Sequence, residues 1–200
     1  GSGAAGGLAG GLAALGARHD AGLDSAVAGR DLRAVVAKHG FPPRTALADE
    51  TIANAIAAAR SLVTKVSDGS NLTLDPDLDS YYLMDGVTST LPVLIETTSQ
   101  LLDVAHAVSR GMPASDSVKR DVTRAEALSD ANDERWAAGL PKVYSLHPDF
   151  KATLRDEAVR HDLHALHELA SSLSGDAGKL AAAGGVIDGL RQVQMKSLEK

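Results

Sequence analysis

Cysteine is absent from the 200 residues of this chain, and aromatic side chains make up 3% of them. Without cysteine the chain has no disulfide framework, no thiol nucleophile and no cysteine-based metal site. A core built from Ala, Val and Leu with few rings suits closely packed helices better than β-sandwiches, which favour aromatic and β-branched residues. The composition therefore predicts an all-α protein.

A long hydrophobic run is also missing. The chain has no stretch of about eighteen apolar residues, which a membrane-spanning helix would need. Its N-terminus lacks the basic start and apolar region of a signal peptide. These absences fit a cytoplasmic protein, and they fit equally a fragment whose membrane segments lie outside the sequence.

Concentrated positive charge is missing as well. The formal net charge is −6, with acidic and basic residues intermixed, whereas binding to a phosphate backbone needs a clustered Lys/Arg surface. The sequence contains no serine-hydrolase, zinc-peptidase, P-loop or kinase motif. We therefore expect no nucleic-acid partner, no cofactor and no catalytic residue.

Apolar residues recur at helical spacing in most of the chain. The pattern predicts helices over residues 24–39, 45–67, 76–110, 115–138, 148–173 and 176–198, with breaks at prolines and glycines. Residues 1–23 are rich in Gly and Ala and are expected to be part expression scar and part frayed helix. The prediction is a single domain, 1–200, folded as an elongated up-and-down helical bundle.

The strongest helix start lies at Asp75, Pro76 and Asp77. Asp75 can cap the helix, Pro76 suits its first turn, and Asp77 places negative charge at the positive end of the helix dipole. The apolar stripe that follows places Tyr81 toward the core. Pro92 lies inside this helix and should bend it.

A second set of candidate residues lies on the helix over 148–173. Glu157, His161, His164 and Glu168 are spaced four, three and four apart, so they share a face that could hold zinc. That face lies about 200° from the apolar stripe and points to solvent, so surface ion pairs are the simpler interpretation. His167 falls at the edge of the stripe.

Small residues recur along the last predicted helix at Gly178, Ala182, Gly185 and Gly189. Such a stripe lets helix backbones approach closely. It indicates either tight packing within the chain or the seam of a homodimer.

Residues 70–85, SNLTLDPDLDSYYLMD, resemble a signature of the extracytoplasmic helical sensor regions of bacterial membrane receptors. The similarity extends through Leu91-Pro92, where that family has a Leu-Pro pair followed by an apolar helix. The receptors include histidine kinases, methyl-accepting chemotaxis proteins and diguanylate cyclases. The resemblance covers about residues 66–96.

The resemblance implies a periplasmic domain held between two transmembrane helices, with its effector module beyond Lys200. A sensor of a histidine kinase is the first expectation, and a chemotaxis receptor or diguanylate cyclase is the alternative. Such a domain responds to a small molecule or a periplasmic partner. A cytoplasmic helical interaction module is the competing class.

A ligand site is expected beside the Pro bend. Tyr81, Tyr82, Asp85 and Ser89 could line a small pocket between helices, where Asp85 would bind an amine or pair with Arg60. In the structural alternative the two tyrosines pack the turn and Asp85 satisfies a neighbouring helix.

Overall fold

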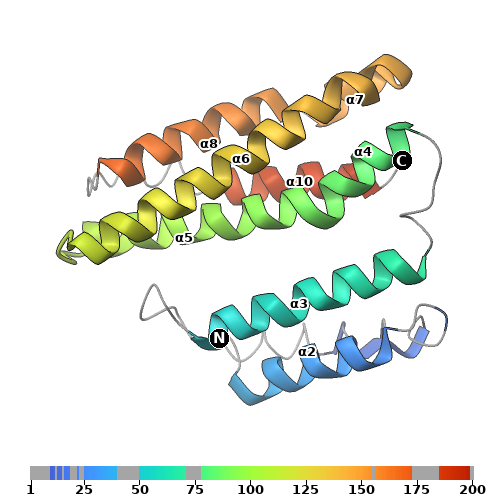
Figure 1. Ribbon diagram of the computed structural model, residues 1–200, viewed down its shortest axis with the longest axis horizontal. Helices are drawn as coiled ribbons and strands as arrows, with labels where there is room; N and C mark the ends of the chain where they lie inside the picture. The colour runs from blue at the N-terminus through green and yellow to red at the C-terminus, as the bar shows by residue number, and fades with distance from the viewer. Residues whose placement is uncertain are drawn as a thin grey trace. The chain divides into compact units, whose positions relative to one another are not determined.

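The computed structural model describes residues 10–11, 13–14, 16–18, 22, 25–39, 50–70, 78–154, 156–172 and 185–198. Within these residues the chain is helical and has no strand, which confirms the predicted all-α helical bundle (Figure 1). Contacts divide the chain into two compact units, Gly1–Asp75 and Pro76–Lys200, where the sequence suggested one domain. No helix in the described part is long and apolar enough to span a bilayer.

The first unit contains α2, Ala26–His39, and α3, Glu50–Gly69, which pack against each other (Figure 1). Ala28, Leu32 and Val36 are buried on α2. Their spacing of four residues places them on one side of the helix. Arg60 is exposed on α3.

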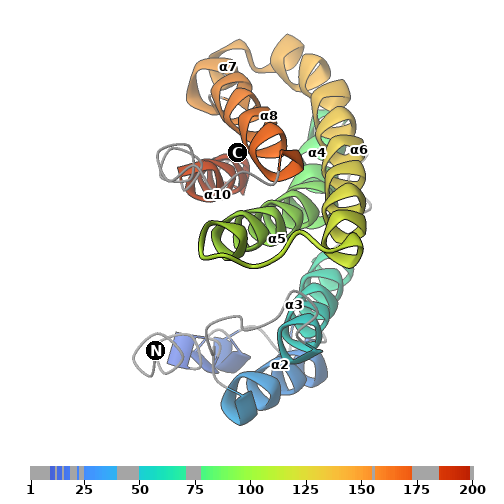
Figure 2. The ribbon, with the colours of Figure 1, turned by 90° about the vertical axis from the view of Figure 1, so that its left-hand side faces the viewer.

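The second unit holds the longest of the described helices, Asp116–Leu146. Its elements are α4 (Leu78–Asp85), the π-helix η2 (Gly86–Thr90), α5 (Leu91–Ser109), α6 (Asp116–Leu146), α7 (Pro148–Leu154), α8 (Asp156–Ser171) and α10 (Gly185–Leu198). In Figure 2, α5, α6, α8 and α10 surround a common centre, and each of them contacts at least two of the others. The inner faces of these four helices form the core together with residues of α4 and α7, and its members are Leu83, Leu91, Leu94, Trp136, Leu140, Val143, Phe150, Leu154, Leu163, Val186, Leu190 and Val193.

The buried stripe of this long helical run lies one residue earlier than the sequence suggested, both before and after the π-helix. Met84, Thr88 and Ile95 are only partly buried, and the buried residues recur at helical spacing at Leu83, Val87, Leu91, Leu94 and Leu101. Tyr81 lies two residues before Leu83, about 200° around the helix from it. The expectation that Tyr81 faces the core was therefore wrong, and Tyr81 is 47% exposed.

Two further boundaries follow local chemistry. α5 ends where Gly111 adopts a φ of 92°, a conformation that glycine tolerates best. α6 begins where the Ser115 hydroxyl accepts the Val118 N–H at 3.4 Å.

Pro141 was expected to break this helix, but α6 continues through it to Leu146. Leu140 and Val143 are buried on either side of Pro141, and their packing offsets the lost backbone hydrogen bond.

The predicted small-residue stripe is described at two of its four positions. A Cβ built on Gly189 would lie 3.0 Å from a methyl of Val159, so α10 approaches α8 closely there. Gly185 has open space around it. Gly178 and Ala182 lie outside the described residues, and the homodimer stays a prediction.

Candidate functional site

Two places on α6 each include a residue that the sequence singled out, Tyr82 at the first and His164 at the second. The first is the aromatic–glycine crossing, which consists of Tyr82, Gly86, Trp136 and Gly139. A Cβ on Gly86 would lie 1.9 Å from Trp136 Cζ3, and a Cβ on Gly139 would lie 2.8 Å from Tyr82 Cδ1. Each helix therefore presents a ring to a glycine of the other, and both glycines are needed for this close approach.

The π-helix at this crossing ends directly before Leu91-Pro92. Leu91 donates its N–H to the Gly86 carbonyl, which is the i→i+5 bond of a π turn. The next carbonyl in that pattern, Val87, would need the N–H of residue 92, which proline lacks. The Gln194 amide of α10 donates to the Val87 carbonyl instead, at 3.0 Å. A side chain from another helix thus completes the hydrogen bonding of η2.

Asp85 connects α4 to α6. Its Oδ1 accepts from Arg135 Nη2 at 2.5 Å, and its Oδ2 lies 3.4 Å from the Thr90 hydroxyl. The Asp85 side chain is 17% exposed and that of Arg135 is 57% exposed. The structure thus gives the Asp85 carboxylate a cation on α6. Arg60 belongs to the other unit, and its pairing with Asp85 stays a prediction.

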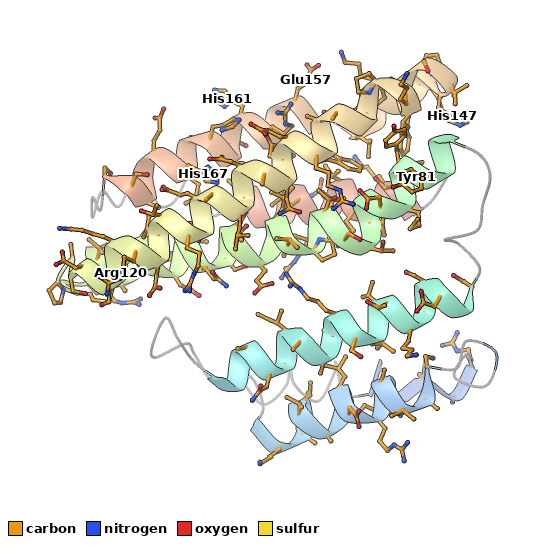
Figure 3. All side chains as sticks on the ribbon, in the orientation of Figure 1. Tyr81, Arg120, His147, Glu157, His161 and His167 are labelled. Atoms are coloured by element: carbon orange, nitrogen blue, oxygen red, sulfur yellow. The ribbon has the colours of Figure 1, made fainter. Side chains whose placement is uncertain are left out.

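We call the segment Leu78–Thr90, where α4 and η2 contact α6, the α4–η2 joint. The other predicted ligand residues lie on its outer side. Tyr81, labelled in Figure 3, is exposed. Its ring meets that of Tyr82 edge-on, with ring centroids 5.5 Å apart. Ser89 is exposed. The structure therefore separates the two tyrosines: Tyr82 packs on α6, and Tyr81 presents its ring to solvent. The helix-start residues Asp75, Pro76 and Asp77 lie outside the described residues.

The second place is the polar seam between α6 and α8, which consists of Ser129, Asp130, Asp133, Arg160, His164 and His167. The side chain of Asp133 is 3% exposed. It accepts from Arg160 Nε at 2.6 Å and from Nη2 at 2.8 Å. The two hydrogen bonds make a bidentate ion pair between the helices. They also raise the pKa of the Arg160 guanidinium.

Two histidines of α8 reach the same seam. His167 is 9% exposed and is held on both sides of its ring, with Nε2 3.0 Å from the Ser129 hydroxyl and Nδ1 3.1 Å from Asp130 Oδ1. His164 Nε2 lies 3.7 Å from Asp133 Oδ2. The two imidazoles are near-perpendicular, with centroids 6.1 Å apart.

The histidine face expected from the sequence is rearranged. Glu157 pairs with Lys151 at 2.9 Å, and His161 lies 3.5 Å from its neighbour Asp162. Glu157, His161 and Glu168 are exposed, and Figure 3 shows Glu157 and His161 on the outer side of α8. Of the four predicted residues, His164 alone belongs to the group of potential ligands that the described residues form, together with Asp130 and His167.

The sequence contained a signal for this seam. On α6, Ser129 and Asp133 occupy positions in the same buried stripe as Ala125 and Trp136. A polar residue at an apolar-stripe position needs a buried partner. On α8, His167 directly follows the buried Leu166. The partners come from a different helix, and spacing along one helix does not identify them.

Tyr144 and Asp156 form a further polar contact between α6 and the first turn of α8. The Tyr144 hydroxyl donates to Asp156 Oδ1, and Asp156 is 4% exposed. Burial, followed by the Asp156 hydrogen bond and charge, raises the pKa of the Tyr144 phenol. The contact therefore depends on the neutral phenol.

The fold defines the class of this protein as an all-α helical bundle. No family model, curated protein or solved structure matches the chain.

Proposed function

We propose that this chain is the signal-input domain of a membrane-bound bacterial receptor of the histidine kinase type. In this proposal it lies in the periplasm between two transmembrane helices and responds to a small molecule or a periplasmic partner. The sensor domain of a chemotaxis receptor or diguanylate cyclase is the alternative within the same class. The resemblance of residues 66–96 to such sensors supports the proposal.

The structural counterpart of that resemblance is the observation that carries the proposal. The described part of the stretch contains α4, η2 and the start of α5, and it meets α6 through Trp136 and α10 through Gln194. π turns inside α-helices are frequent at functional sites. A sensor needs an element with two arrangements that a ligand can bias, and a helix with a π turn held by side chains of two other helices is suited to that role.

Tyr81, Asp85 and Ser89 would bind the ligand at the α4–η2 joint. Tyr81 and Ser89 are exposed, and Asp85 is shared with the partly exposed Arg135. A ligand that binds the Asp85 carboxylate competes with Arg135 for it. Losing this ion pair would loosen α4 from α6 next to the π turn, and a shift of α5 would then carry the signal.

The first test is the coding sequence on either side of these residues. The proposal predicts an apolar span of about twenty residues on each side. Flanking sequence without such spans would overturn the receptor assignment and favour the cytoplasmic interaction module.

The second test identifies the ligand and its site. The chain is screened by thermal shift against a metabolite library, because a ligand that binds the folded state raises Tm. The ligand should lose affinity for the double variant Tyr81→Ala/Asp85→Asn. Asp121→Asn is the matched control, because Asp121 also pairs with an arginine on the surface, Arg124, at 2.9 Å. Equal affinity for the double variant and for the unmodified chain would contradict the assignment of the site.

A further inference from the structure

Asp130, His164 and His167 place three ligand atoms together in the polar seam. One atom from each residue lies within 4.8 Å of the other two. The two imidazoles come from consecutive turns of α8, and the carboxylate comes from α6. Bundle proteins build metal sites in this way, from side chains on facing helices with an i, i+3 pair on one of them.

The separation of the two nearest atoms matches a shared metal ion. His167 Nδ1 and Asp130 Oδ1 are 3.1 Å apart. Zinc binds nitrogen and carboxylate oxygen at about 2.0–2.2 Å with tetrahedral angles, so two of its ligands lie about 3.4 Å from each other. An ion could therefore be held between these atoms with little movement of either helix.

The outer nitrogen of His167 is already oriented. The fully buried Ser129 hydroxyl lies 3.0 Å from Nε2. Metal-bound histidines almost always hydrogen-bond through their second nitrogen, which fixes the ring and its tautomer. With Nε2 engaged by Ser129, Nδ1 is the nitrogen that faces Asp130.

Charge and access also favour a cation. With both histidines neutral, Asp130 and Asp133 carry two negative charges, and Arg160 supplies one positive charge against them. The side chains of Asp130 and His164 are 54% and 58% exposed. Three protein ligands with an open side leave a fourth position for water, as in open zinc sites.

We propose that Asp130, His164 and His167 bind a divalent transition metal ion, zinc in the first place, between α6 and α8. The site is separate from the α4–η2 joint and does not rest on the proposed sensor function. The competing arrangement is metal-free: Ser129 donates to His167 Nε2, and Nδ1–H donates to Asp130. When the metal binds Nδ1, the neutral imidazole carries its one proton on Nε2, and Nε2–H then donates to the Ser129 hydroxyl oxygen.

The experiment uses the full chain without a histidine tag, stripped of metal and titrated with zinc against a chromophoric chelator. We expect one zinc ion per chain and a Tm that rises with zinc concentration. Cobalt(II) should bind at the same stoichiometry and give the intense visible absorption of a four-coordinate ion. A chain that takes up no stoichiometric zinc or cobalt overturns the proposal.

Variants locate the ion. Ser129→Ala removes the hydroxyl that contacts His167 Nε2 and should weaken zinc binding about 10–100-fold. Asp130→Asn and His164→Gln change exposed side chains, so both variants should fold. Each should weaken zinc binding by more than Ser129→Ala does. His167→Gln should also weaken it, and circular dichroism shows whether this variant keeps its fold.

The control is the double variant His161→Gln/Glu168→Gln, which alters the outer face of α8 and leaves the three ligands intact. It should bind zinc as the unmodified chain does. If this variant loses zinc while Asp130→Asn retains it, the ion binds the outer face and the proposed site is wrong. Because zinc uptake is measured on the isolated chain, this result is independent of any receptor response.

Discussion

The helix α6 meets its neighbours in two different ways. Toward α4 and η2 it presents Trp136 and Gly139, and the contact is made by rings lying on glycines. Toward α8 it presents Ser129, Asp130 and Asp133, and the contact is made by hydrogen bonds and ion pairs. One helix thus forms a close apolar crossing on one side and a polar seam on another.

The two contacts differ in what they can respond to. At the aromatic–glycine crossing a Cβ on either glycine would clash with a ring, so the contact depends on shape, and one added methyl group is felt. The polar seam holds side chains that bind protons or cations and are partly open to solvent. The first contact is suited to transmit a movement of α4, and the second is suited to bind an ion.

Removing the Trp136 ring from the aromatic–glycine crossing should give the largest loss of stability. Trp136→Ala should lower the free energy of unfolding by about 3–5 kcal/mol, because it removes a buried indole and leaves a cavity. Urea denaturation followed by circular dichroism measures this effect. Leu128→Ala is the control, since Leu128 is 48% exposed on the same helix and should change stability by less than about 0.5 kcal/mol.

Removing the Arg160 cation should destabilise the polar seam between α6 and α8. Arg160→Met leaves Asp133 buried without its guanidinium and should cost about 3 kcal/mol, the lower end for a broken buried pair. The double variant Asp133→Leu/Arg160→Met removes both charges and should be more stable than Arg160→Met alone. If the single variant is as stable as Arg124→Met, which alters an exposed pair, the seam has no buried charge.

A single methyl group tests the closeness of the crossing. Gly86→Ala should destabilise the protein by about 1–3 kcal/mol through overpacking against Trp136, although alanine is the better helix former. In the Trp136→Ala background the same substitution should cost less, because the ring is gone. Gly185→Ala, where a Cβ meets open space, should be neutral or stabilising. An unchanged cost in both backgrounds would show that Gly86 and Trp136 are not coupled.

The smallest effect concerns Tyr144, beside the start of α8. Tyr144→Phe should cost about 1–2 kcal/mol at neutral pH, because Asp156 loses a donor. The unfolded phenol loses its proton near pH 10.0, whereas the folded one keeps it. The unfolded state then binds fewer protons, so this contribution is present below pH 10 and declines above it. Denaturation midpoints should therefore converge between the two proteins in alkali, and a constant difference would contradict the prediction.

The sequence located most of the described helices, and it failed at points set by other helices. It placed Tyr81 in the core because it set the apolar stripe one residue too late along the helix, at Met84 and Thr88 instead of Leu83 and Val87. It treated Glu157 and Glu168 as partners of His164 because they share a helix face. In the structure His164 faces Asp133 at 3.7 Å, and Asp133 comes from α6.

The helical class was determined by the sequence alone, because apolar spacing, caps and helix-ending residues act within a few positions of each other. Ser115, Gly111 and the stripe of Val118, Val122 and Ala125 show this on α5 and α6. The tertiary structure decided which glycine receives Trp136, which amide completes η2 and which carboxylate faces His167. These pairings join residues far apart in the chain, and they depend on how side chains fit between helices, which local periodicity does not encode.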